Sequence, residues 1–116
     1  MSLTSPNGAD LYYVETFDRP SPLWRVPLSG GVATKVLEGV VRSNFTVLAG
    51  GIYYIDQPSG EARLQYFDFA TGRSRTVARN LGNVGLGLTA SPDGRTILYT
   101  RNDSSVDDLM LVENFH

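Results

Sequence analysis

A repeat of 41 to 45 residues runs through this 116-residue chain and constrains its fold more than any other feature. The segment Leu11-Tyr12-Tyr13-Val14 matches Ile52-Tyr53-Tyr54-Ile55 at an offset of 41 residues, and Ile97-Leu98-Tyr99-Thr100 follows 45 residues later. The first and third copies also share the preceding turn, Ser5-Pro6-Asn7-Gly8 and Ser91-Pro92-Asp93-Gly94, without a gap. Such a period indicates units that bury their apolar surface against their neighbours.

Each copy is predicted to form four short β-strands, and the copies span about 1–39, 40–82 and 83–116. Val, Ile, Tyr, Phe and Thr dominate the second and third strands, and no segment keeps a helical period, so we expect essentially no helix. A first strand before Ser5 is only a stub, and a fourth strand after Phe115 is missing. The first strand of a copy is expected at 44–49 and 87–90, and the second at 11–16, 52–56 and 96–101. The third is expected at 23–28, 64–69 and 109–113, and the fourth at 33–37 and 74–78.

The polarity of these strands indicates how the copies assemble. The second strand is apolar on both faces, with Leu11 and Tyr13 on one side and Tyr12 and Val14 on the other. Its sheet must therefore be covered by other elements on both faces. The fourth strand is largely polar, as an outer edge needs to be to resist pairing with other chains. Stacked sheets with apolar inner strands and charged outer strands, at this repeat length, are typical of β-propeller blades.

The composition excludes several classes of function. Ten basic against twelve acidic residues give a net charge of −2, which argues against nucleic-acid binding by this segment. The absence of Cys excludes disulfides, thiolate catalysis and cysteine zinc sites. The longest apolar stretch, 47–55, is too short to span a bilayer, and the first residues lack the features of a signal peptide. The compartment stays undecided between cytoplasm and periplasm.

We expect no catalytic, cofactor-binding or metal-binding residues. The single histidine, His116, is the last residue, where order is least expected, so a Ser-His-Asp site is not predicted. The acidic segment Asn102–Asp108 lacks the glycine and alternating oxygens of a calcium loop and is interpreted as a solvated hairpin loop. The glycine-rich segment Leu81–Gly87 lacks the lysine of a phosphate loop and is interpreted as a connector.

One loop is a candidate contact site. Phe17, Arg19 and Trp24 flank Pro20-Ser21-Pro22 and offer two aromatic rings and a guanidinium for a protein partner. Three other arginines, at positions 73, 75 and 79, cluster at alternate residues, which favours a solvated strand edge over a phosphate site.

At this point the sequence resembles the WD-like propeller repeats of the TolB-like type. The resemblance is carried by Ser91 to Tyr99, by the weaker copy Ser5 to Tyr13, and by Asp108-Leu109-Met110-Leu111-Val112, and it covers nearly the whole chain. The segment 108–115 is similar to the end of propeller regions attached to bacterial signalling proteins, including winged-helix regulators and Ser/Thr kinases. The resemblance implies an all-β fold of about three four-stranded antiparallel blades of a six-bladed propeller.

The expected function is that of a non-catalytic module for protein interaction or ligand sensing within a larger bacterial signalling protein or transcriptional regulator. The alternative is the propeller gate of a prolyl-oligopeptidase-like serine peptidase, whose catalytic Gly-x-Ser-x-Gly motif does not occur in this chain. Propellers close with about four to eight blades, so the partners are expected to be remaining blades or a second copy. Two copies would supply six blades, which predicts a head-to-tail dimer. No cofactor is expected.

Overall fold

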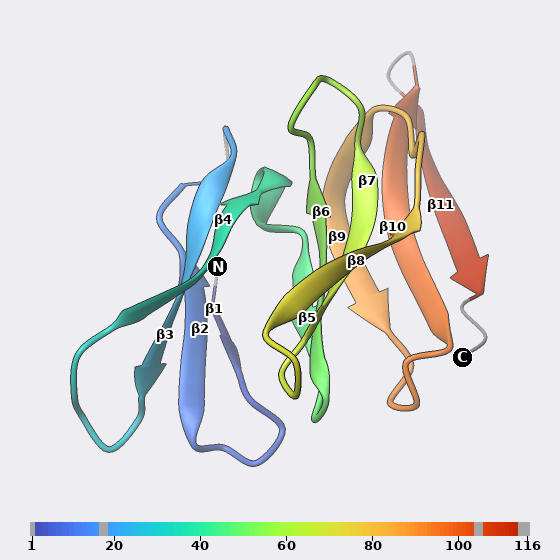
Figure 1. Ribbon diagram of the computed structural model, residues 1–116. Helices are drawn as coiled ribbons and strands as arrows, with labels where there is room; N and C mark the ends of the chain where they lie inside the picture. The colour runs from blue at the N-terminus through green and yellow to red at the C-terminus, as the bar shows by residue number, and fades with distance from the viewer. Residues whose placement is uncertain (1, 17–18, 104–105, 114–116) are drawn as a thin grey trace.

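Three antiparallel β-sheets stand side by side in the computed structural model, which describes residues 2–16, 19–103 and 106–113 (Figure 1). Within those ranges the one helical segment is a three-residue 3-10 turn, η1 (Val41–Ser43), and no helix is long and apolar enough to cross a membrane. The predicted all-β fold is therefore confirmed. Sheet I contains β1 (Ser2–Thr4), β2 (Asp10–Val14), β3 (Ser21–Pro27) and β4 (Thr34–Val40); sheet II contains β5 (Phe45–Val47), β6 (Gly51–Asp56), β7 (Arg63–Asp68) and β8 (Arg73–Ala78); and sheet III contains β9 (Val84–Ala90), β10 (Thr96–Asp103) and β11 (Val106–Glu113).

The repeat is visible in the strand register. Leu23 pairs with Leu37 in sheet I, and Leu64 pairs with Ala78 in sheet II, each 41 residues further on. The pairing is irregular directly after Leu23 and directly after Leu64, so both sheets also share a bulge at the same position. The two sheets are therefore equivalent residue by residue through their second, third and fourth strands.

Several predicted strand boundaries were wrong. β3 begins at Ser21, inside the expected loop, because the buried Ser21 hydroxyl accepts a hydrogen bond from the Glu15 amide at 2.9 Å. β9 begins at Val84, within the expected glycine-rich connector. β10 and β11 extend to Asp103 and from Val106, so most of the expected acidic loop is a strand hairpin. The hydrogen bonds between paired strands are made by backbone groups alone. Polar and glycine-rich segments can therefore continue a strand although their side chains are typical of loops.

The core lies between the sheets and consists of two separate clusters. One cluster joins sheets I and II around Tyr12, Leu23 and Ile52, and the other joins sheets II and III around Tyr53 and Ile97. Sheet II is thus covered on both faces, and four consecutive residues of β6, 52–55, are at most 6% exposed. This confirms that the second strand of a copy is buried on both sides where a neighbour stands on each side.

Each sheet has two faces that differ in role. We call the side toward the following sheet in chain order the forward face and the opposite side the backward face. Tyr12 and Leu23 lie on the forward face of sheet I, and their repeat equivalents Tyr53 and Leu64 lie on the forward face of sheet II. Ile52 of sheet II and Ile97 of sheet III are likewise equivalent and both face backward. Every contact between sheets is therefore a forward face on a backward face.

Polar groups also join sheets II and III. The buried Asn44 side chain donates to the Gly85 carbonyl at 2.8 Å and accepts from the Gly87 amide at 3.0 Å, which fixes the irregular start of β9. The Tyr53 hydroxyl of the forward face donates to the Gly94 carbonyl at 2.8 Å, in the turn before β10. Because buried polar groups need partners, these bonds specify which surfaces meet.

Candidate functional site

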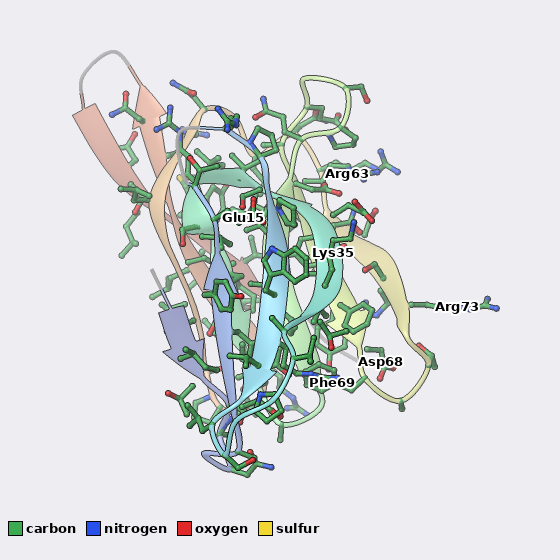
Figure 2. The ribbon with its side chains drawn as sticks, turned by 90° about the vertical axis from the view of Figure 1, so that its left-hand side faces the viewer. Glu15, Lys35, Arg63, Asp68, Phe69 and Arg73 are labelled. Atoms are coloured by element: carbon green, nitrogen blue, oxygen red, sulfur yellow. The ribbon has the colours of Figure 1, made fainter. Side chains whose placement is uncertain are left out.

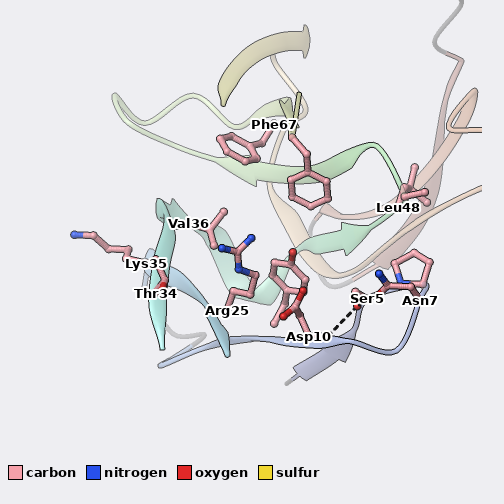
Figure 3. Close-up of a pocket in the computed structure, with 13 residues that line it drawn as sticks. Ser5, Asn7, Asp10, Arg25, Thr34, Lys35, Val36, Leu48 and Phe67 are labelled. Carbon is pink, nitrogen blue, oxygen red and sulfur yellow. Dashed lines mark hydrogen bonds between the residues drawn. The ribbon is translucent and has the colours of Figure 1, made fainter. Parts of the chain in front are cut away.

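A groove with a volume of about 710 Å³ opens between sheets I and II (Figure 3). This volume lies in the range of about 300–1,000 Å³ that small-molecule sites occupy. One wall comes from β2, β3, the start of β4 and the turn before β2, and the other comes from the end of β7 and the turn after β5. The groove is lined by Ser5, Pro6, Asn7, Asp10, Tyr12, Arg25, Thr34, Lys35, Val36, Leu48, Ala49, Phe67 and Phe69.

Arg25 is the cation that projects into this groove. It lies opposite Tyr12 in the β2–β3 ladder, and its side chain extends past Val36 toward the strand that carries Phe67 (Figure 3). Arg25 is only partly exposed, and among the described residues its guanidinium has neither a hydrogen bond nor an ion pair. Lys35 contributes to the rim, but its side chain leads away from the groove and pairs with Glu38 at 3.2 Å.

Aromatic rings face Arg25 from sheet II. Phe67 and Phe69 meet edge to face with ring centroids 6.0 Å apart, and Phe69 also stacks on Tyr12 across the two sheets at 6.4 Å. Aromatic surfaces of this kind provide contact area with little loss of side-chain freedom. The groove thus combines an apolar wall with a guanidinium directed toward it.

The corresponding space between sheets II and III is filled. The residue equivalent to Arg25 is Tyr66, and its ring packs on the Tyr53 ring with centroids 4.7 Å apart. Tyr66 lies across Gly51, where a Cβ atom would stand 2.6 Å from the end of the Tyr66 ring. The residue equivalent to Gly51 in sheet I is Asp10, which has a side chain. These two differences between equivalent positions of sheets I and II accompany an open first interface and a filled second one.

These features define what the groove can bind. The Arg25 guanidinium has no anionic partner among the described residues of the groove, and its planar fork can donate two hydrogen bonds to a carboxylate. The rings beside it favour an apolar group next to that carboxylate. The arrangement offers no nucleophile paired with a base, and within the three described ranges no three acidic or histidine side chains gather closely enough to hold a metal ion.

The candidate contact loop lies apart from the groove. Phe17 falls outside the described residues, and Arg19 is exposed between β2 and β3. Trp24 lies in β3 and alternates with Arg25, so it belongs to the backward face of sheet I, where its Nε1 donates to the Glu15 carboxylate at 2.8 Å. The role of this loop stays a prediction, and neither Arg19 nor Trp24 lines the groove.

The clustered arginines occupy the outer edge of sheet II. Arg73 is exposed in β8 and points away from the molecule (Figure 2). The Arg75 guanidinium lies over the Tyr66 ring, 5.3 Å from its centroid, and Arg79 approaches Glu61 at 3.5 Å. Their side chains are therefore those of a solvated strand edge.

The two matching turns are built alike. The Ser5 hydroxyl donates to the Asn7 side chain and accepts from the Asp10 amide at 3.1 Å, and Ser91 does the same for Asp93 and Thr96. Hydrogen bonds from the Ser91 hydroxyl and the Arg95 amide lower the pKa of Asp93. These polar residues therefore serve turn formation, as their composition indicates.

Sequence reasoning missed Arg25. The signal that could have found it is the repeat itself, because Arg25 stands where the other two copies have Tyr66 and Leu111. A charged residue at a position that is apolar in equivalent units departs from the packing pattern and marks a place to look for function.

Comparison with solved structures supports the fold. The chain superposes on TolB from Acinetobacter baumannii with a TM-score of 0.78 and 14% sequence identity, covering 97% of this chain and 29% of that one. It superposes on a putative TolB from Agrobacterium tumefaciens with a TM-score of 0.73 and 19% identity, covering 95% of this chain and 40% of that one. No protein-family model and no curated protein matches the sequence. The chain thus has the fold of TolB-like β-propeller blades and spans less than half the length of these two proteins.

Proposed function

We propose that this chain is a non-catalytic interaction module whose first inter-sheet groove binds a peptide segment with a carboxylate beside an apolar side chain. The observation that carries the proposal is the unpaired Arg25 guanidinium facing the Phe67 and Phe69 rings. Because the Arg25 donors have no protein partner within the described part of the chain, a ligand carboxylate can form a charge-assisted hydrogen bond there.

The wider setting supports a role within a larger protein. The chain covers 29% and 40% of the two solved TolB structures, and blades of this kind need neighbours. We place it in a bacterial signalling protein or transcriptional regulator, with the groove as the sensing or docking surface. The gate of a prolyl-oligopeptidase-like peptidase is the alternative, and a hydrolase domain in the same reading frame would decide for it.

The proposal is tested by titrating the chain with terminally blocked tripeptides that carry Glu between two apolar residues. We expect saturable shifts of the backbone NMR signals of residues along the groove. The same peptides with Gln in place of Glu should bind at least about tenfold more weakly, because a hydrogen bond to a charged group contributes about 1.5–3 kcal/mol.

The matched variants are Arg25→Gln and Arg73→Gln, which remove one guanidinium each. Arg25→Gln should weaken binding of the Glu peptide to the level of the Gln peptide, whereas Arg73→Gln, on the outer edge of β8, should leave it unchanged. Equal affinity for both peptides, or an equal loss in the two variants, contradicts the proposal. So does the absence of any binding.

A further inference from the structure

The outermost faces of the three-sheet array carry repeat equivalents of the residues that meet inside it. Leu98 of sheet III is the repeat equivalent of Tyr12 and Tyr53, which are both buried on forward faces. Leu109 is the equivalent of Leu23 and Leu64, which are both 0% exposed. Leu109 is 71% exposed, although its equivalents are fully buried. The forward face of sheet III therefore has the pattern of an interface and lacks a neighbour among the described residues.

The backward face of sheet I shows the complementary pattern. Its apolar strip comprises Leu11, Tyr13, Trp24 and Val26, all partly exposed. Leu11 and Tyr13 are the repeat equivalents of Ile52 and Tyr54, which are buried against the preceding sheet. Figure 2 looks onto this side of the molecule, where Glu15 and Lys35 stand beside the strip. This face therefore matches the surface that receives a forward face elsewhere in the chain.

We propose that two copies of this chain associate head to tail, with the forward face of sheet III in each copy packed on the backward face of sheet I in the other. The proposal stands apart from the groove. Both internal interfaces join a forward face to a backward face, and a second copy offers both kinds of surface with the same repeat pattern. Two copies of three sheets give a ring of six, within the range of about four to eight blades in which propellers close.

The internal interfaces also predict which residues meet between copies. Tyr12 on the forward face of sheet I stacks on Phe69 of sheet II. The equivalents of this pair are Leu98 and Leu28. Leu28 is a true structural equivalent of Phe69, because its amide donates to the Ala9 carbonyl as that of Phe69 donates to Gly50. Leu98 of one copy should therefore contact Leu28 of the other, which accounts for the 53% exposure of Leu28 in a single copy.

The association is tested by light scattering behind size-exclusion chromatography over a concentration series. The unmodified chain should have twice its 12.7 kDa mass. Leu111→Glu on the forward face and Val26→Glu on the backward face should each give the mass of one chain, because each puts a charge into both interfaces of the ring. Val32→Glu, at an 86% exposed position between β3 and β4, is the matched control and should keep the doubled mass.

A mixture of the two face variants tests the head-to-tail arrangement itself. The forward face of the Val26→Glu chain and the backward face of the Leu111→Glu chain are both intact, so these two faces can still pack on each other. The mixture should therefore show a mass above that of one chain, whereas each variant alone should not. Circular dichroism confirms that each variant keeps its β-structure. Three results overturn the proposal: a single-chain mass for the unmodified protein at every concentration, a mixture that stays monomeric, or dimerisation of the Val26→Glu chain by itself.

Discussion

At the scale of single residues, the groove depends on two positions, Asp10 and Arg25. Their equivalents, Gly51 and Tyr66, close the next interface, because a glycine lets the tyrosine ring lie across the sheet and pack on Tyr53. A sequence alone shows that Arg25 breaks the apolar pattern, but the opening of a groove depends on how closely two sheets approach. That approach is a property of packing, which the local pattern does not contain.

The double substitution Asp10→Gly and Arg25→Tyr should copy the closed interface into the open one. A glycine within a strand costs about 0.5–1 kcal/mol, and an aromatic pair contributes about 0.5–1.5 kcal/mol beyond the area it buries. We therefore expect the free energy of unfolding, measured with urea, to be unchanged or higher, while affinity for the Glu tripeptide falls at least about tenfold. Full peptide affinity in a folded double variant would argue against this account of the groove.

Asp93 gives one of the two matching turns a pH dependence. Hydrogen bonds from Ser91 and Arg95 lower its pKa in the folded chain, so the carboxylate stabilises the fold above its unfolded pKa, and this contribution disappears as the pH falls through the folded value. Asn7 forms the equivalent turn without titrating.

Asp93→Asn should therefore be less stable than the unmodified chain at neutral pH, and the difference should shrink as the pH falls below about 4. Urea unfolding at neutral pH and at about pH 3 measures both values. A difference that stays constant or grows in acid would show that the charge of Asp93 does not stabilise the turn. Asn7→Ala is the control, because it perturbs the equivalent turn through a group that does not titrate.

At the scale of elements, the pattern of apolar residues and the repeat predict that the strands exist, but they do not predict where each strand begins and ends. Residues 52–55 of β6 are all aliphatic or aromatic, which predicts a strand buried on both faces there, and the structure confirms this. The length of the turn before it could not be predicted from the repeat. Val47 pairs with Ile52, whereas Thr4 pairs with Leu11 and Ala90 with Ile97, so the second turn is two residues shorter. The second turn lacks the Ser-Pro-Asx-Gly sequence whose side-chain hydrogen bonds build the two longer turns.

Leucine occupies the same position of β3, β7 and β11, which allows a matched series of substitutions. Leu23→Ala and Leu64→Ala each empty a fully buried site and should lower the free energy of unfolding by about 2–5 kcal/mol. Leu109→Ala should cost less than about 0.5 kcal/mol at concentrations where the chain is monomeric, because the side chain is exposed there. At concentrations that favour the dimer its cost should rise. Equal costs at Leu109 under both conditions would show that this face stays uncovered.

At the scale of the whole molecule, we propose that the two outermost faces are the two halves of an interface that occurs twice inside the chain. The repeat explains why both halves are apolar although they face outward in a single copy. The sequence predicts a need for partners from the number of copies, and the structure adds which surfaces and which side chains should meet.

The most direct measurement is thiol cross-linking between Leu28→Cys and Leu98→Cys chains, made possible because the protein has no cysteine of its own. A short bismaleimide should join the two variants when they are mixed, since these positions are equivalent to the stacked Phe69 and Tyr12. Neither variant alone should form cross-linked dimers. Efficient cross-linking of Leu98→Cys to itself, or none in the mixture, would contradict the head-to-tail arrangement.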